Sequence, residues 1–371
     1  MKRRHALSLL TGAVSGAASS SHASGSTQAQ LHAPTTNWSF ADSGFVIGRT
    51  SSTSTSGTPR SRDTEYFDAL LSSSARLCRI FVTFGMAGGS AGFSISRGTL
   101  RELSSVISLC EAREIRLVLA FEVNGAHTSR FWSDELFRES YIRCIVEIAE
   151  YIAASNSVAG LDLLNEPNPP HDSRGVAGAA HACNGFMESA VRALRRSGWQ
   201  RAILVQPVAG GAASAMRHQK PLDDKNIVYS IHFYVPHDIT HQFVGTSWVR
   251  AIPYPADISW GLGAWDPGLG VTRIDLERLV RELAPVVEFQ RVNGARIYVG
   301  EFSCVRWAPA DSSLRYVLDC LKLFRSYDWA WAYHEFRGWH GWDAELPLTH
   351  STDAKRSRST PTMRLLRSAL Q

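Results

Sequence analysis

Long hydrophobic runs are missing from this chain of 371 residues, of which 44% are hydrophobic and 20% charged. No charge-free apolar stretch reaches the roughly 18 residues of a membrane-spanning helix, so a polytopic membrane protein is excluded. A large excess of one charge is missing too. The formal net charge is +5, and Lys2, Arg3 and Arg4 supply three of these charges. The remainder is close to neutral and gives no reason to expect nucleic acid as a partner.

The cysteine patterns of metal sites and disulfide frameworks are also missing. The six cysteines include no CxxC pair. We therefore expect neither a structural zinc site nor a dense set of disulfides. The sequence leaves one bridge open, between Cys304 and Cys320, if the protein is exported.

The first 23 residues have the pattern of an export signal. A basic cluster precedes the mildly apolar run 6–18, and Ser21-His22-Ala23 has the small-x-small spacing of a signal-peptidase site. The pair Arg3-Arg4 also resembles a twin-arginine signal, and the alternative is a disordered basic tail. We predict a signal peptide over 1–23, a flexible lead-in over 24–40, and export to the periplasm or the extracellular space.

Strand-like and helix-like segments alternate along the rest of the chain. The strands are expected at 45–48, 77–84, 116–123, 158–165, 202–206, 227–234, 296–302 and 329–334. The helical patterns between them cover 64–72, 100–113, 135–154, 178–197, 275–293 and 312–327. Several of these strands are apolar on both faces, which is typical of a parallel sheet covered by helices.

Eight such units predict a single α/β domain, a (β/α)8 TIM barrel over residues 41–350. A doubly wound sheet is the rival fold, but no GxGxxG or Walker-type loop follows the first strand. The last residues, 351–371, are predicted to form a C-terminal basic tail or helix in which residues 355–358 are solvated.

A long irregular stretch, 237–272, follows the sixth strand and carries Trp248, Tyr254, Trp260 and Trp265. A loop of this length inside a compact domain is usually functional or mobile. In a barrel it lies at the C-terminal face, where active sites are built. The rings either stack on the apolar faces of sugars or pin the loop to the barrel, and the sequence supports both interpretations equally.

Carboxylates close two of the apolar strands. The fourth strand ends in Asn165-Glu166-Pro167, and Pro167 must stop strand pairing. The seventh strand ends in Glu301, which strict alternation places on one face with Ile297 and Val299. Two such groups can face each other across the barrel mouth, and glycoside hydrolysis needs a pair of this kind.

These motifs resemble those of family 5 glycoside hydrolases, the cellulase-type retaining barrel enzymes. The matching positions are Asn165-Glu166-Pro167, Gly300-Glu301-Phe302, Arg79 in strand two, and His232 and Tyr234 in strand six. The resemblance spans roughly residues 45–342. Five positions in the right strand order make it specific, although each short motif alone would be weak.

The resemblance implies a double displacement on a β-linked polysaccharide, most simply a cellulose-like β-glucan. Glu166 would be the general acid/base and Glu301 the nucleophile, with carboxyl groups about 5–5.5 Å apart and retention of configuration. Arg79 and Tyr234 would keep Glu301 ionised. No metal or cofactor is implied, the partner is the polysaccharide or oligosaccharide substrate, and a monomer is the default.

The other matching residues would contact sugar, and two positions depart from the family. Asn165 would bind the sugar 2-hydroxyl, and His232 would orient Glu166 or a sugar hydroxyl. Strand three ends without the usual histidine, so Glu122, Asn124 or His127 takes that contact. Strand eight ends in His334 where the family usually has tryptophan, followed by Trp339 and Trp342, which makes His334 and Trp339 candidate substrate-binding or supporting residues.

Other interpretations stay open at this point. Glu166 could merely open a helix capped by Asn165, and Arg79 could be a core ion-pair partner. A metal shared by His232, His237 and His241 is disfavoured because Pro236 breaks the strand between them.

Alternative functions are a β-mannanase or a transglycosylase on the same machinery, and a sugar-binding barrel without catalysis. A metal-dependent hydrolase barrel is expected to carry a His-x-His motif at its first strand. The first strand expected here, 45–48, has no such motif.

Overall fold

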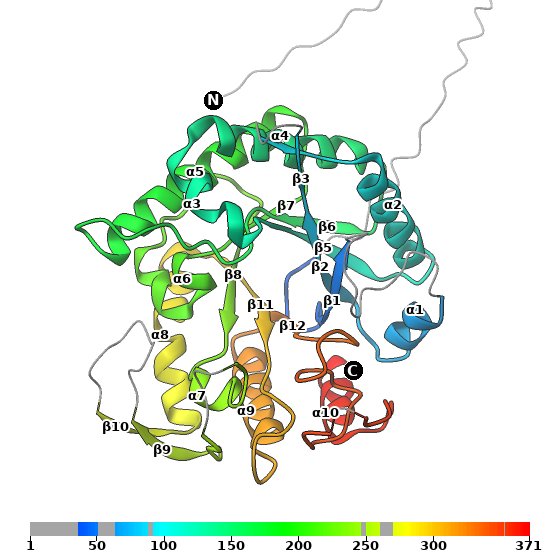
Figure 1. Cartoon of the computed structure of the whole chain (residues 1–371), viewed down its shortest axis with the longest axis vertical. Helices are drawn as coiled ribbons and strands as arrows, with labels where there is room; N and C mark the ends of the chain where they lie inside the picture. The colour runs from blue at the N-terminus through cyan, green and yellow to red at the C-terminus, as the bar shows by residue number, and fades with distance from the viewer. Residues whose placement is uncertain (1–35, 51–63, 88–91, 246–249, 260–269, 352) are drawn as a thin grey trace, which may run out of the picture. The chain divides into compact units, whose positions relative to one another are not determined.

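The computed structural model describes residues 36–50, 64–87, 92–245, 250–259, 270–351 and 353–371. Its centre is a closed barrel of eight parallel strands (Figure 1). In the order of their hydrogen bonding these are β1 (Gly44–Thr50), β12 (Ala330–Tyr333), β11 (Arg296–Phe302), β8 (Ile227–Phe233), β7 (Ala202–Val205), β6 (Val158–Asp162), β5 (Arg116–Glu122) and β2 (Leu77–Thr83). All eight predicted strands are present, and the predicted TIM barrel is confirmed.

The predicted helices surround the barrel. They are α1 (Thr64–Leu71), α2 (Arg97–Glu111), α4 (Glu135–Tyr151), α5 (Val176–Arg196), α8 (Leu276–Asn293) and α9 (Ser312–Ser326). Side-chain caps define three of their starts, since Ser96, Asp134 and Asp275 accept hydrogen bonds from backbone N–H groups of the first turns of α2, α4 and α8. None of the described helices has the length and apolar character needed to cross a membrane.

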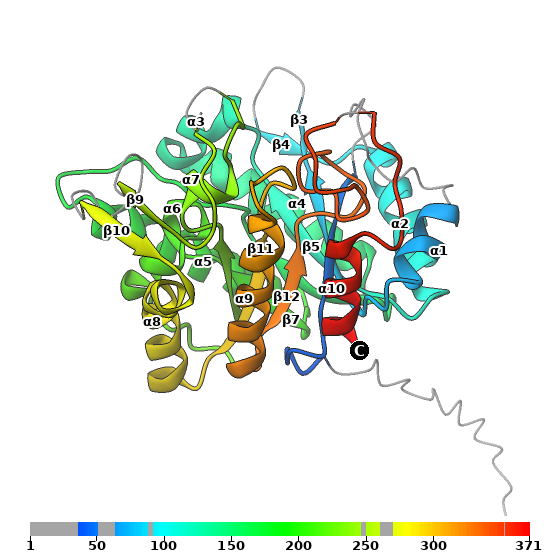
Figure 2. The ribbon, with the colours of Figure 1, turned by 90° about the horizontal axis from the view of Figure 1, so that it is seen from below.

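Shorter elements surround the barrel, and of these only the last, α10 (Pro361–Leu370), lies where the sequence analysis predicted a tail or helix. They are β3 (Gly85–Met86), β4 (Phe93–Ser94), η2 (Gly125–His127), α3 (Thr128–Ser133), α6 (Val208–Gly211), η3 (Ala213–His218), α7 (His237–Thr240), β9 (Ala256–Ser259), β10 (Val271–Ile274) and α10 (Pro361–Leu370). Figure 2 places α3, α7 and the segment after β12 at the end toward which the barrel strands point. This C-terminal end of the barrel is where sites are built in this fold.

Strand alternation separates two buried layers. Outward side chains such as Leu161 and Leu163 join the large core between strands and helices. Inward side chains form a smaller cluster that fills the barrel: Trp38, Val46, Leu77, Phe81, Val118, Ala120, Ala202, Leu204, Val228, Tyr298, Ala330 and Ala332. Asp162 lies between two outward leucines and is fully buried, so it points into the barrel with the polar groups of the site.

The described chain begins before the predicted start of the barrel. Trp38 and Phe40 are buried, and the Trp38 ring meets that of Tyr298 edge-on with centroids 5.6 Å apart. The barrel therefore includes residues that the sequence analysis assigned to the flexible lead-in. The predicted signal peptide, 1–23, lies outside the described residues.

The basic segment near the C-terminus is exposed, and one of its side chains is anchored. Arg356 forms an ion pair with the buried carboxylate of Asp343 at 2.6 Å, and α10 buries Met363 and Leu366. Residues 355–358 are all exposed, as expected of a solvated segment, and the Arg356 side chain keeps 46% of its surface exposed while it pairs with Asp343.

The stretch after the sixth barrel strand contains regular structure. It begins with α7, and β9 pairs with β10 in an antiparallel hairpin. Tyr254 is buried, and its hydroxyl donates to the Asp319 carboxylate on α9 at 2.9 Å. This ring therefore pins the segment to the barrel. Trp248, Trp260 and Trp265 lie outside the described residues.

All six cysteines are buried free thiols. The Cys304–Cys320 bridge that the sequence left open is not formed. Burial raises the pKa of the Cys78 and Cys183 thiols to about 12, so neither is a reactive thiolate at neutral pH.

Candidate active site

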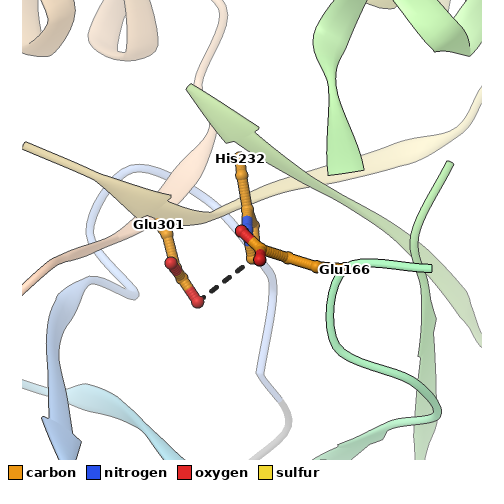
Figure 3. A group of neighbouring side chains, drawn as sticks. All are labelled: Glu166, His232 and Glu301. Carbon is orange, nitrogen blue, oxygen red and sulfur yellow. Dashed lines mark hydrogen bonds and ion pairs between the residues drawn. The ribbon is translucent and has the colours of Figure 1, made fainter. Parts of the chain in front are cut away.

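Two carboxylates face each other at the C-terminal end of the barrel, with an imidazole beside both. Glu166 follows β6, Glu301 lies on β11, and His232 on β8 reaches both (Figure 3). His232 Nδ1 is 2.9 Å from Glu166 Oε1, and its Nε2 is 3.6 Å from Glu301 Oε1. An oxygen of each carboxylate lies within 4.8 Å of the other. This spacing is close to the roughly 5–5.5 Å of retaining glycosidases and below the roughly 6.5–9.5 Å of inverting ones.

A β-bulge turns Glu301 into the barrel. In the pairing of β11 with β8, Val299 lies opposite Ile231 and Glu301 opposite His232, so Gly300 is one extra residue. Ile297 and Val299 pack in the outer core, so the expectation that Glu301 shares their face is wrong. A Cβ on Gly300 would lie 2.6 Å from Ser230 Oγ, which explains why the bulge needs glycine.

The nucleophile candidate is buried among donors. Glu301 Oε1 accepts from Arg79 Nη1 at 2.7 Å, and Oε2 accepts from the Tyr234 hydroxyl at 2.9 Å. Burial by itself raises the pKa of Glu301, but His232, His334 and Arg79 outweigh burial and hold it well below the usual range. Glu301 is therefore a carboxylate over a wide pH range, while the Glu166 side chain is about half exposed, at 47%.

Arg79 joins the two halves of the site. It is fully buried on β2 and donates to Asp162 Oδ2 through Nε at 3.1 Å and Nη2 at 2.9 Å. Nη2 also donates to Asn165 Oδ1 at 2.8 Å. Arg79 is thus an ion-pair partner in the core and a site residue at once, so the two interpretations of its role coincide.

Asp162 and Gln206 are site residues that the sequence analysis missed. Gln206 Nε2 donates to Asp162 Oδ2 at 2.8 Å, and Gln206 Oε1 accepts from the backbone N–H of Glu166 at 3.0 Å. That contact fixes Glu166, whose φ of 50° is uncommon for a residue other than glycine. A signal was present, because alternation between Leu161 and Leu163 already places Asp162 on the inner face.

The segment after β12 adds a second imidazole. His334 Nδ1 is 2.7 Å from the Tyr234 hydroxyl and 3.1 Å from Glu301 Oε2, and Nε2 is 3.8 Å from Glu335 Oε2. Burial alone lowers the pKa of His334, but Glu301 and Glu335 outweigh it and raise the pKa. Glu335 was not predicted from the sequence.

Two tryptophans continue outward from this imidazole. The Trp342 ring stacks on Tyr234 with centroids 5.6 Å apart and lies 5.0 Å from the His334 ring. Trp339 meets Trp342 edge-on at 4.8 Å. Trp342 is therefore next to the carboxylates, and the predicted Trp339 is one ring farther away.

Two of the candidates at the end of strand three have partners within their own part of the chain. Asn124 Oδ1 accepts from Ala126 N at 3.0 Å and so caps its own turn. The His127 ring packs against Phe93 and Phe137, with centroids 6.4 and 6.1 Å away. The sugar contact expected of Glu122, Asn124 or His127 stays a prediction.

The trio Glu166, His232 and Glu301 has the spacing of a metal site, since one ligand atom from each lies within 4.8 Å of the others. The chemistry of the group disfavours a cation. The Arg79 guanidinium already donates to Glu301 Oε1, so a metal ion at these residues would lie beside a permanent positive charge. We assign no metal to these residues.

A parallel barrel whose mouth holds two opposed carboxylates, only one of them paired with a buried arginine, defines a barrel glycoside hydrolase. The chain belongs to the cellulase family, glycosyl hydrolase family 5, whose profile matches residues 41–338. It is an endoglucanase-like member, as the relatives below indicate.

Endoglucanase C of Acetivibrio thermocellus is 25% identical over 249 residues, which are 62% of this chain and 70% of that protein. Endoglucanase 3 of Fibrobacter succinogenes is 22% identical over 225 residues, 54% of this chain and 33% of that protein.

Solved structures confirm the fold. Thermotoga maritima Cel5A in complex with cellobiose superposes with a TM-score of 0.62 at 19% identity, covering 82% of this chain and 90% of that one. A hyperthermophilic endo-beta-1,4-glucanase in complex with substrate superposes with a TM-score of 0.64 at 16% identity, covering 88% and 98%.

Proposed function

We propose that this protein is a retaining endo-β-glucanase that cleaves a cellulose-like glucan by double displacement. The observation that supports it most is the pairing of Glu166 and Glu301, whose oxygens lie within 4.8 Å and of which only Glu301 is bound by Arg79. One carboxyl group is thereby committed to the ionised form, and the other is left accessible to substrate. Double displacement needs this division of labour.

In the first step a Glu301 oxygen attacks the anomeric carbon while Glu166 gives its proton to the departing glycosidic oxygen. The C–O bond to the leaving sugar breaks, and a glycosyl ester of Glu301 forms. In the second step Glu166, now a carboxylate, takes a proton from water, whose oxygen attacks the anomeric carbon and releases Glu301. Two inversions return the sugar to its original configuration.

The surrounding residues have supporting roles in this proposal. The amide oxygen of Asn165 accepts a hydrogen bond from Arg79. Its NH₂ group is therefore the donor that would contact the sugar 2-hydroxyl. His232 holds Glu166 through Nδ1. Tyr234 and His334 hold the nucleophile, and the Trp342 ring, with Trp339 beyond it, would form the floor under the sugar next to the cleaved bond.

The names of the relatives support a β-glucan as substrate, since they are endoglucanases and an endo-beta-1,4-glucanase. Thermotoga maritima Cel5A was also solved with mannotriose, which favours a β-mannan as the second candidate. Export is part of the proposal and rests on residues 1–23. N-terminal sequencing of the protein from the host's culture fluid or periplasm tests it, and an intact Met1 in all of the protein would contradict it.

We expect Glu301→Gln to lower hydrolysis of an aryl β-cellobioside by at least about a thousandfold. The thermal melt should change little, because Arg79 keeps Asp162 and Asn165 as acceptors. Glu277→Gln, on an exposed carboxylate of α8, is the matched control. NMR of the first-formed product should show the β-anomer. Turnover by Glu301→Gln close to that of the wild type would disprove the assignment.

A further inference from the structure

A second carboxylate lies beside the imidazole that contacts the nucleophile. Glu335 follows His334 in the segment after β12 and is buried, with 7% of the residue exposed. Its Oε2 is 3.8 Å from His334 Nε2, while His334 Nδ1 is 3.1 Å from Glu301 Oε2. The ring thus has a carboxylate next to each of its two nitrogens. None of the proposed catalytic steps uses Glu335.

The hydrogen bonds of Tyr234 place a proton on one nitrogen of the ring. The Tyr234 hydroxyl donates to Glu301 Oε2 at 2.9 Å, so its oxygen is the acceptor in the 2.7 Å contact with His334 Nδ1. Nδ1 therefore carries a proton. A neutral ring would then direct the lone pair of Nε2 toward the Glu335 carboxylate. A second proton on Nε2 replaces this repulsion with the attraction between an imidazolium and a carboxylate.

The two charges depend on each other. Among the described residues, His334 is the cationic partner of Glu335. Burial raises the pKa of Glu335, and His334 is the main group that opposes this effect. Burial alone would lower the pKa of His334, but Glu301 and Glu335 outweigh burial and raise it. Since an unpaired charge is costly at this depth, loss of the Glu335 charge removes part of what keeps the ring protonated.

The other titratable and charged groups around the pair come from several elements: Glu301 (β11), Tyr234 (after β8), Arg79 (β2), His241 (α7), Tyr66 (α1), Tyr333 (β12) and Asp343 in the segment of Glu335 itself. Burial raises the pKa of the three tyrosines and keeps them neutral. Burial also lowers the pKa of His241 to about 3, so this ring is neutral too. Asp343 is paired with Arg356 at 2.6 Å. None of these groups can replace Glu335 as the counter-charge at Nε2.

Backbone contacts hold the Glu335 carboxyl group in this position. Its Oε1 accepts from the Trp339 N–H. A Cβ on Gly338 would lie 1.9 Å from Glu335 Oε2, so the carboxyl group packs directly on a glycine backbone. The next residue, Phe336, is buried, and its carbonyl oxygen accepts from the Tyr66 hydroxyl at 2.9 Å. The position of Glu335 is therefore fixed before substrate binds.

The proposed reaction changes the charge on one side of the His334 ring only. In the glycosyl-enzyme Glu301 is a neutral ester, whereas Glu335 keeps its charge. In the second step the bond between Glu301 and the anomeric carbon breaks, water supplies the new oxygen and gives its proton to Glu166, and Glu301 recovers its negative charge. An imidazolium beside Glu301 stabilises this developing charge. It gives no such help in the first step, in which Glu301 loses charge.

We propose that Glu335 is a positioning residue, which keeps His334 an imidazolium through both steps and thereby speeds the release of the sugar from Glu301. The inference rests on the proposed function and adds a control of its second step. It assigns no sugar contact to Glu335.

The first measurement is an NMR titration of the His334 ring in protein labelled at the histidine nitrogens, with the signal assigned by its loss in His334→Gln. In the wild type both ring nitrogens should carry protons at neutral pH. Glu335→Gln keeps an oxygen for the Trp339 N–H but removes the charge, and it should lower the titration midpoint of His334 by roughly one pH unit. Glu345→Gln is the matched control, because this buried carboxylate of the same segment pairs with Arg337 at 2.6 Å. It should leave the midpoint unchanged.

The second measurement separates the two steps. Dinitrophenyl β-cellobioside has so good a leaving group that the second step limits kcat, while kcat/KM reports the first step. A burst of dinitrophenolate verifies this. At pH values above its own His334 midpoint, Glu335→Gln should lower kcat by roughly tenfold without lowering kcat/KM. At lower pH its kcat should approach that of the wild type, and Glu335→Asp, which restores the charge, should recover part of the loss.

Three results would overturn the proposal. The first is a wild-type His334 ring that is neutral at neutral pH, which is measured without any variant. The second is an unchanged His334 midpoint in Glu335→Gln. The third is an equal fall of kcat and kcat/KM at every pH, because Glu335 would then act only in the packing of its segment.

Failure of the proposed function is recognised separately. If the wild type hydrolyses neither the aryl cellobioside nor a β-glucan, the proposed function fails and the role of Glu335 in the second step fails with it. The titration still decides whether Glu335 keeps His334 protonated, since it needs no substrate.

Discussion

At the scale of single residues, the arginine and imidazole groups of the site gather around one of the two carboxylates, Glu301. Glu301 has Arg79 at 2.7 Å, His334 at 3.1 Å and His232 at 3.6 Å. Among the described residues Glu166 pairs only with His232, at 2.9 Å. The pKa of Glu301 lies well below the usual range although burial alone would raise it. A nucleophile with this environment stays ionised in mild acid.

We expect His334→Gln to move the acid limb of the kcat/KM–pH profile to higher pH by roughly one unit. The sign follows from charge. The activity of a carboxylate nucleophile is lost as the pH falls through its pKa, and removing a neighbouring cation raises that pKa. Hydrolysis of an aryl β-cellobioside across the acidic range measures the shift, and His181→Gln, on the exposed face of α5, is the control. An unmoved acid limb would show that His334 does not stabilise the charge on Glu301.

At the scale of elements, the position of the nucleophile depends on the bulge in β11. The extra residue Gly300 lets Tyr298 and Glu301 both face the barrel interior while Val299 and Phe302 join the outer core. A regular strand would have sent Glu301 outward, away from Arg79.

Gly300→Ala should therefore lower the free energy of unfolding by about 1–3 kcal/mol, because its Cβ would lie 2.6 Å from Ser230 Oγ. It should also lower kcat, since relief of the clash displaces Glu301. Gly185→Ala in α5, where a Cβ meets nothing within 4 Å, should be neutral or stabilising. Denaturant unfolding and steady-state kinetics measure both variants. Wild-type stability and kcat in Gly300→Ala would mean that the bulge does not set the geometry.

The periodicity of apolar residues was sufficient to predict the barrel strands and the major helices. It did not predict the short elements between them. All eight strands and six major helices follow from apolar patterning, because each buries a face over many residues. The hairpin β9–β10 carries little of that pattern, since few of its residues are buried. Helix α10 buries Thr362, Met363 and Leu366 at helical spacing, and a helix was one of the two predictions for this segment.

The same limit applies to the site. Glu166, Glu301, Arg79, His232 and Tyr234 come together as predicted, because each follows or ends a recognisable strand. The bulge at Gly300 is a register effect between strands that one strand's sequence does not contain. Glu335 and Trp342 lie in an irregular segment, which offers no periodicity from which to place them.

At the scale of the whole molecule, six thiols are sealed in the interior of the barrel and its helices. Burial is the main cause that raises the pKa of all six thiols, for example that of Cys144 to about 12. The fold is thus complete without a disulfide, whatever compartment it occupies.

The native protein should therefore give almost no reaction with a water-soluble disulfide reagent at neutral pH, and all six thiols should react after unfolding. A reducing agent should leave the melting temperature unchanged, because there is no bridge to break. Fewer than six thiols in the unfolded, unreduced protein would reveal a disulfide and contradict this structure.

The run of contacts from Glu301 through Arg79, Asp162 and Gln206 to the Glu166 backbone has a consequence for protein engineering. These contacts connect the nucleophile Glu301 to the acid/base Glu166. A substitution among them that alters the surroundings of one carboxyl group therefore also alters those of the other. Attempts to change the working pH of this enzyme will therefore succeed more readily at His334, which contacts Glu301 from outside this set of contacts, than at Arg79 or Asp162.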